Sequence, residues 1–232
     1  MIESEPQAPF RQELDALVQS IASAGFVNGL SQTVLKMTLP GVPDFYQGTE
    51  LWDFNLVDPD NRRPVDFTER RRLLAEVSHD FAEKPSQLAE ELGRRSADPR
   101  IKMLLIWRTL HFRLAEPELF ATGDYLPLAV TGARATHVLA FARRQEHRWA
   151  VVATPLRVRQ LSDAKDAPSD SVPSIDWANT AVALPADAPV EWRNEFTGEL
   201  IDVVRSPVGK IVVPVADILS PLPVALLSSF SG

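Results

Sequence analysis

The amino-acid sequence predicts an α+β fold, with helices in the first half of the chain and antiparallel strands in the second. Two observations lead to this prediction. Apolar residues recur at helical spacing before Pro117, and short strand-like segments separated by turn residues follow it. The change predicts a helical part, residues 1–115, and a β-sandwich domain, residues 116–232.

The first part contains several segments with helical periodicity. Helices are predicted at 9–24, 26–38, 68–81 and 98–114, with a weakly packed helix or a loop at 84–95. Gly25 separates the first two, because it interrupts the apolar pattern. Asp98 and Pro99 form a strong helix start, an Asp cap followed by Pro in the first turn.

The helical part contains one candidate strand, Val42–Tyr46, followed by a loop at 47–66. A lone strand cannot form a sheet, because its backbone groups need partners. Residues 1–115 are therefore either an unusual helical unit or a piece of a larger fold.

The second part predicts a series of short strands bounded by turn residues. They lie at Tyr125–Val130, His137–Arg143, Trp149–Thr154, Ala181–Leu184, Val190–Asn194, Ile201–Val204, Lys210–Val213 and Val224–Ser229. Thr197 and Gly198 have the composition of a hairpin turn. Several short strands in a row predict a small antiparallel β-sandwich.

Composition excludes several classes of function. The chain has a formal net charge of −7, which argues against a nucleic-acid partner, and it has no apolar run long enough to predict a transmembrane helix. It contains no cysteine, so it has neither disulfides nor a thiolate site, and a reducing cytoplasm fits this composition.

The sequence predicts no metal site and no cofactor. The four histidines, His79, His111, His137 and His147, lack metal-ligand spacing. The segment from Asp58 begins like a calcium loop, but Arg62 occupies the third ligand place and the turn glycine is missing. No phosphate loop, dinucleotide fingerprint or nucleophile elbow is present.

The candidate functional segment is PGVPDFYQGTELWDFNLVDPDNRRPVD, residues 40–66. Trp52 in this loop is either a lid that anchors the loop or a flat platform for a sugar ring. Arg62 and Arg63 lie between the acids Asp58, Asp60 and Asp66. Such a cluster is either a solvated ion-pair network or a set of fixed donors and acceptors for a polyol.

The same segment carries a family resemblance. The pattern from Gly41 through Pro43 and Gly48 to Glu50 is similar to the region around the eighth barrel strand of the α-amylase superfamily, glycoside hydrolase family 13. The longer run closely resembles the maltooligosyltrehalose synthases. The resemblance extends upstream through NGLSQTVLKMTLP and downstream through RIKMLLIWRTLHFRLAEPELFATGDYLPLAVTGARATHVLAFAR, and it ends in the PLPVALL segment.

The resemblance implies that residues 1–115 are the end of a TIM (β/α)8 barrel, including its last strand, and that the β-sandwich follows it. It implies an intramolecular transglycosylation that converts the reducing-end linkage of a maltooligosaccharide to the α,α-1,1 linkage of trehalose. The family's nucleophile Asp, acid/base Glu and third Asp follow earlier strands. No acid here matches those motifs, so no catalytic residue is carried over.

The resemblance does imply a substrate-binding loop at the mouth of the barrel. Its expected residues are Tyr46, Gln47, Trp52, Asp58, Asp60, Arg62 and Arg63. Three hypotheses follow. The chain is part of the enzyme and inactive alone, or a free-standing maltooligosaccharide-binding or accessory module, or a structural remnant. The first implies the N-terminal barrel portion, or self-association, as a partner; no membrane and no nucleic acid are expected.

Overall fold

The structure of the chain is a computed structural model that describes residues 9–55, 58, 60–161, 171–206 and 209–229. Its helices and 3-10 turns are α1 (Pro9–Thr38), η1 (Asp60–Arg62), α2 (Phe67–Glu83), α3 (Pro85–Gly93), α4 (Pro99–Ala115), α5 (Pro117–Ala121), η2 (Ala135–His137), η3 (Val158–Gln160) and α6 (Val215–Ile218). None of the helices in the described residues is long and apolar enough to cross a membrane.

The strands occupy the second half of the chain, as the sequence predicts. They are β1 (Asp124–Pro127), β2 (Val130–Thr131), β3 (Val138–Gln145), β4 (Arg148–Pro155), β5 (Ala181–Ala183), β6 (Glu191–Asn194), β7 (Leu200–Asp202), β8 (Val204–Arg205), β9 (Ile211–Pro214) and β10 (Ala225–Ser229). They form a sheet of order β1-β3-β4-β10-β6-β7 and a second of order β2-β5-β9-β8, and every pairing is antiparallel. The predicted antiparallel sheets are confirmed.

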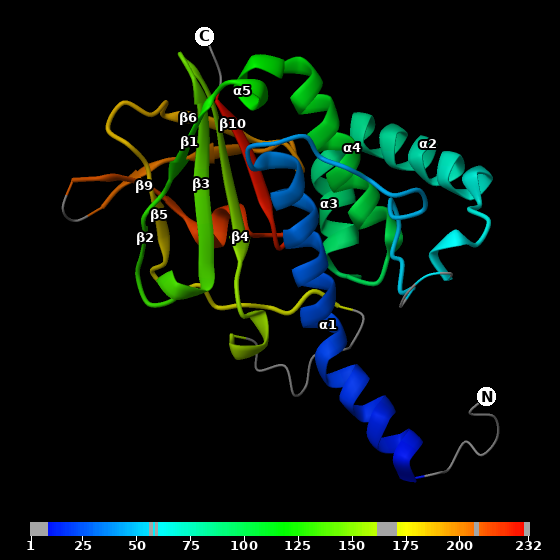
Figure 1. The fold of residues 1–232 in the computed structure, drawn as a ribbon. Coiled ribbons are helices and arrows are strands. Elements are labelled where there is room, and N and C mark those ends of the chain that lie inside the picture. Colours follow the sequence, from blue (N-terminus) through cyan, green and yellow to red (C-terminus); the bar gives the residue numbers. More distant parts are fainter. Residues whose placement is uncertain (1–8, 56–57, 59, 162–170, 207–208, 230–232) are drawn as a thin grey trace.

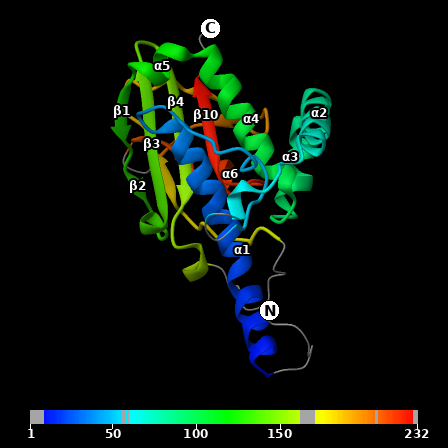
Figure 2. The same ribbon diagram turned by 45° about the vertical axis from the view of Figure 1, so that its right-hand side comes forward.

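The six-stranded sheet is buried on both faces. On β3, Ala140 and Ala142 belong to an apolar cluster that also contains Val182 and Val213 of the second sheet. Phe141, between them, belongs to another cluster, shared with helices α1 to α5. Side chains alternate across a strand, so burial of both faces explains why β4 is an almost continuous apolar run. The helices therefore cover the outer face of this sheet (Figures 1 and 2).

Helix α1 is one continuous helix, so the predicted break at Gly25 is wrong. Gly25 is exposed, and an added Cβ would meet no atom within 4 Å. A glycine inside a helix costs about 1 kcal/mol relative to alanine. Burial of Val27, Leu30 and Val34 in the following turns outweighs that cost, because a fully buried Val or Leu contributes about 1.5–3 kcal/mol.

The remaining helices follow the predictions with one correction. Helix α2 covers the predicted segment, and α4 begins at Pro99 with the Asp98 carboxylate accepting a hydrogen bond from the Arg100 amide. The prediction of a weakly packed segment at 84–95 is wrong, because Leu88 and Leu92 of α3 are buried against the helical cluster.

The predicted strand Val42–Tyr46 is not a strand in the structure. Val42 is 95% exposed and Tyr46 is 49% exposed, and both lie in the segment between α1 and α2. A strand needs a neighbour to complete its ladder, and no other part of the described chain pairs with this segment. Three predictions therefore remain untested: that residues 1–115 are a barrel fragment, that the domain boundary lies between 115 and 116, and that the second part is a sandwich domain.

Candidate functional site

The candidate site is the segment between Thr38 and Phe67, and its start is held by the end of α1. The Arg113 guanidinium donates a hydrogen bond to the Met37 carbonyl oxygen at 2.6 Å. Arg143 on β3 donates to the Thr38 carbonyl oxygen at 3.3 Å. Cations at a helix C-terminus compensate its unpaired carbonyls and its dipole. Two elements that are distant in sequence therefore fix where the loop begins.

Arg70 on α2 ties the middle of the loop to its end. Its guanidinium donates to the Gly48 carbonyl oxygen at 2.7 Å, to the Glu50 carboxylate at 3.0 Å and to the Asp66 carbonyl oxygen at 3.1 Å. The guanidinium fork suits several acceptors at once. Gly48 has φ +92, and a Cβ there would lie 3.2 Å from Val65, so the turn requires glycine.

Trp52 anchors the loop to α1. The ring lies against Gly29, where an added Cβ would be 3.1 Å from the ring edge, and its centroid is 4.9 Å from that of Phe26. Lys102 on α4 donates to the Leu51 carbonyl oxygen at 3.1 Å and lies 5.6 Å from the Trp52 ring centroid. These contacts favour the lid interpretation of Trp52 over a free platform, and a glycine at 29 lets the indole approach the helix.

A groove of about 740 Å³ lies beside Trp52. Its lining combines an apolar helix face, the aromatic rings of Phe26, Trp52 and Phe54, and the charged groups of Lys36, Lys102 and Asp53. Two ammonium groups and one carboxylate make the charged part of this lining net positive, with Glu50 already paired to Arg70.

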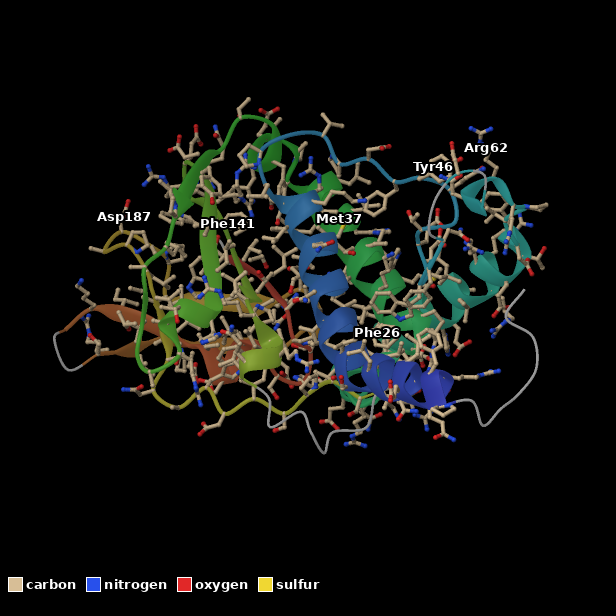
Figure 3. All side chains as sticks on the ribbon, turned by 60° about the horizontal axis from the view of Figure 1, so that its bottom comes forward. Phe26, Met37, Tyr46, Arg62, Phe141 and Asp187 are labelled. Carbon is tan, nitrogen blue, oxygen red and sulfur yellow. The ribbon has the colours of Figure 1, made fainter. Side chains whose placement is uncertain are left out.

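The remaining predicted site residues whose side chains are described, Tyr46, Gln47, Asp58, Arg62 and Arg63, are exposed. Tyr46 and Gln47 lie at the tip of the first turn, where the Tyr46 carbonyl oxygen accepts hydrogen bonds from the Thr49 amide and hydroxyl. Arg62 pairs with Asp58 at 2.8 Å, and both side chains are more than half exposed. Arg63 is also exposed, while the side chain of Asp60 falls outside the described part. Tyr46 and Arg62 lie toward the same end of the molecule (Figure 3).

The structure divides the predicted residues into two groups. Trp52 belongs to the anchored half of the loop, whereas Tyr46, Gln47, Asp58, Arg62 and Arg63 have surface available to a ligand. An isolated exposed ion pair contributes at most about 1 kcal/mol to stability. The Arg62–Asp58 pair therefore leaves the Arg62 fork able to exchange its partner for another acceptor at small cost. Binding roles for these residues stay predictions.

Sequence reasoning missed the residues that support the loop. Arg70 lies in a run of three arginines, 70–72, and nothing in that run distinguishes the one that faces Gly48 and Glu50. Lys102 lies in an apolar helix segment. The sequence does not indicate that its ammonium group donates a hydrogen bond to the Leu51 carbonyl oxygen. Arg143 lies within the otherwise apolar part of β3, and its burial depends on the approach of α1 and α5.

The histidines have ordinary structural surroundings. The Nδ1 atom of His111 lies 2.9 Å from the Trp107 carbonyl oxygen, and that of His137 lies 3.2 Å from the Leu156 carbonyl oxygen. Among the residues with described positions, no group of three or more acidic or imidazole side chains is arranged to hold a metal ion.

Burial beside the groove lowers the pKa of the Lys102 ammonium, and the nearby charge of Lys36 lowers it further; Asp53 and Glu50 act in the opposite direction. A lowered lysine pKa means that the unfolded chain binds more protons between the folded pKa and the ordinary value of 10.5. We therefore expect the free energy of unfolding to rise with pH in that window. Urea unfolding of Lys102→Met should show a flatter pH dependence, and an unchanged slope would contradict this.

Comparison with known proteins shows that the chain belongs to the maltooligosyltrehalose synthase family. It is 34% identical over 190 residues to a curated Mycobacterium tuberculosis protein that carries the name maltooligosyl trehalose synthase; the match covers 82% of this chain and 20% of that protein. No family model matches.

Solved structures agree in fold. A point mutant of maltooligosyltrehalose synthase from Arthrobacter ramosus matches with a TM-score of 0.73 and 29% identity over 98% of this chain and 27% of that one. The enzyme without this mutation matches with a TM-score of 0.70 and 30% identity over 96% of this chain and 25% of that one. The chain thus spans between 20% and 27% of the length of these relatives. In sequence and fold it corresponds to a C-terminal portion of maltooligosyltrehalose synthase.

Proposed function

We propose that the chain supplies one wall of the saccharide site of a maltooligosyltrehalose synthase, with the segment from Tyr46 to Arg63 facing the substrate. The 34% identity over 190 residues to a protein of that name is the observation that carries the proposal. The exposed Arg62 and Asp58 and the anchored Trp52 are consistent with a loop that is rigid at its base and polar at its tip. A cytoplasmic location, favoured by the absence of cysteine, belongs to the same proposal.

The proposed contribution of this chain is positioning. The reducing-end glucose has to be retained, turned and offered to the glycosyl-enzyme while water is excluded. Arginine forks and carboxylates can hold sugar hydroxyls in one orientation. Because no acid in the chain matches the family's catalytic motifs, the nucleophile and the acid/base have to come from the preceding part of the enzyme. The chain alone is therefore expected to form no trehalose.

The test is a trehalose-forming assay on a maltooligosaccharide. We expect activity when this chain is joined to the polypeptide that precedes the matched region in the Mycobacterium tuberculosis relative, and none with either piece alone. In the joined protein, replacing both Arg62 and Arg63 by alanine should lower kcat/KM roughly 10–100-fold, the loss expected when hydrogen bonds from charged groups to substrate disappear.

Arg71→Ala is the matched control, because Arg71 is exposed on α2 outside the loop. It removes a charge of the same kind and should leave kcat/KM within about twofold. The thermal melting of all variants should stay unchanged. Full activity of the double variant would refute the binding role, and trehalose formation by this chain alone would refute the division of labour.

A second candidate is a free-standing maltooligosaccharide-binding module. The groove favours it, because three aromatic rings, from Phe26, Trp52 and Phe54, line one cavity. Titration of the isolated chain with maltooligosaccharide, followed by tryptophan fluorescence, separates the two. Saturable binding by the isolated chain, combined with no trehalose formation by the joined protein, would support the module and exclude the enzyme part.

A further inference from the structure

The two halves of helix α1 present apolar residues toward different sides, about 130° apart on average around the helix axis. One face packs inward through Ala24, Val27, Leu30 and Val34, each at most 6% exposed. The other, which we call the open face, consists of Phe10, Leu14, Leu17, Val18 and Ile21, each between 43% and 66% exposed. A surface helix of a globular protein buries its apolar stripe, so the exposed apolar stripe in the first half of α1 indicates a surface that another polypeptide segment covers.

The open face continues into the groove beside the candidate site. Val18 and Ile21 also line that groove, followed one and two turns later by Gly25 and Gly29. Gly25 has open space where a Cβ would stand, so another chain can approach the helix backbone there. The first half of α1 extends beyond the body of the molecule (Figures 1 and 2). Arg159 reaches this half of α1 only at Ser20 among the hydrogen bonds of the described residues, and the five residues of the open face stay largely exposed.

We propose that the open face of α1 and the adjoining groove form the docking surface for the polypeptide that corresponds to the preceding part of maltooligosyltrehalose synthase. This inference rests on the proposed function and names the partner of the same site. The chain covers only 27% of the Arthrobacter ramosus structure, so most of the polypeptide of that enzyme has no counterpart here. A large contiguous apolar surface on a single chain marks an interaction site.

The position of the groove favours this partner over a second copy of the chain. Trp52 and Phe54 of the candidate loop line the same cavity as Val18 and Ile21 of the open face, so a partner seated there contacts the anchored half of that loop. The charged lining, Lys36 and Lys102 against Asp53, is net positive. It therefore complements a partner that presents carboxylates at the groove and apolar side chains along Phe10 to Ile21.

The absence of cysteine makes a direct test possible, because one introduced thiol is the only one in the chain. Leu17→Cys places a thiol at the centre of the open face. Gln19→Cys is the matched control, since residue 19 is also exposed and lies about 200° away around the helix. The partner probe is the separately produced polypeptide that precedes the matched region of the Mycobacterium tuberculosis relative, and the measurement is the rate of maleimide labelling.

We expect both thiols to react at similar rates in the isolated chain at every protein concentration. Saturating partner polypeptide should slow labelling of Leu17→Cys about tenfold, as expected when nine in ten molecules are bound, and leave Gln19→Cys unchanged. Concentration-dependent protection of Leu17→Cys without the partner would identify a second copy as the occupant and overturn the proposal. Equal labelling of both thiols with saturating partner would overturn it as well.

The two proposals fail separately. Protection of Leu17→Cys without trehalose formation would leave the docking surface standing and remove the proposed function. Trehalose formation by the joined protein, with Leu17→Cys still fully reactive in it, would do the reverse. Leu17→Asp gives a second measurement, because it should weaken association at least about tenfold while the melting temperature of the exposed helix variant stays unchanged.

Discussion

Replacing Glu195 by alanine is expected to lower the free energy of unfolding by about 3–5 kcal/mol. Glu195 lies in the turn between β6 and β7 and is only 8% exposed. Its carboxylate accepts hydrogen bonds from Arg108 of α4 at 2.6 Å and from the Ser228 hydroxyl of β10 at 2.6 Å. The group therefore joins a helix to two strands at a point where water is largely excluded.

The large effect follows from what the substitution leaves behind. The Arg108 guanidinium is held 4.4 Å from the Phe81 ring centroid, so it cannot move freely into water. Without the Glu195 carboxylate the largely buried Arg108 charge keeps only the hydrogen bond from its Nε to the carbonyl oxygen of residue 195, and a desolvated charge without its ion-pair partner costs more than the original pair contributes. Ser228 loses its acceptor as well, which adds about 1 kcal/mol.

Urea unfolding measures this effect, with the slope of the transition checked for two-state behaviour. Glu199→Ala is the control, because Glu199 lies in the same turn region but is exposed. It should change the free energy of unfolding by no more than about 0.5 kcal/mol. Equal destabilisation by the two variants would show that the Arg108 pair contributes nothing specific.

Replacing Arg143 by alanine is expected to lower the free energy of unfolding by about 3 kcal/mol or more. The side chain is 1% exposed and donates hydrogen bonds to carbonyl oxygens of Thr38, Phe120 and Gly123 at 2.9–3.3 Å. Its removal leaves the buried contacts to the Thr38 and Phe120 carbonyls and the partly buried contact to the Gly123 carbonyl without this donor, and it opens a cavity beneath α1. Burial lowers the pKa of the Arg143 guanidinium, and the nearby charge of Arg113 lowers it further. Holding this charge in the folded protein therefore costs free energy, and removing it partly offsets the destabilisation.

Arg144→Ala is the matched control for Arg143. Arg144 follows directly on β3, points to the other side, and makes exposed pairs with Asp124 and Asp187. Its removal should cost no more than about 1 kcal/mol. Hydrogen exchange gives a second readout, because loss of Arg143 should speed exchange in the turn after Thr38 more than elsewhere. If Arg143→Ala stabilises the protein, the cost of the buried charge exceeds the three hydrogen bonds.

Much of the fold was predictable because the signals are local. Asp98 and Pro99 predict the start of α4, since a cap and a fixed φ act within one turn. The segments His137–Arg143 and Trp149–Thr154 predict β3 and β4 nearly to the residue, because short apolar runs bounded by turn residues are typical of buried strands. Predictions were wrong where tertiary contacts determine the structure. Burial of Leu30 and Val34, for example, stabilises α1 as one helix across Gly25.

The candidate site divides in the same way. The sequence by itself determined the position of the loop and the Asp and Arg residues within it, because these depend on the composition of the segment and on side-chain chemistry. Only the tertiary structure decided that Arg70 closes the loop, that Trp52 lies on Gly29, and that Val42–Tyr46 forms no strand. These outcomes depend on whether a partner atom is present in space. The sequence pattern reports the intrinsic conformational preference of each segment. A hydrogen bond or a buried face also requires a partner group from another part of the structure.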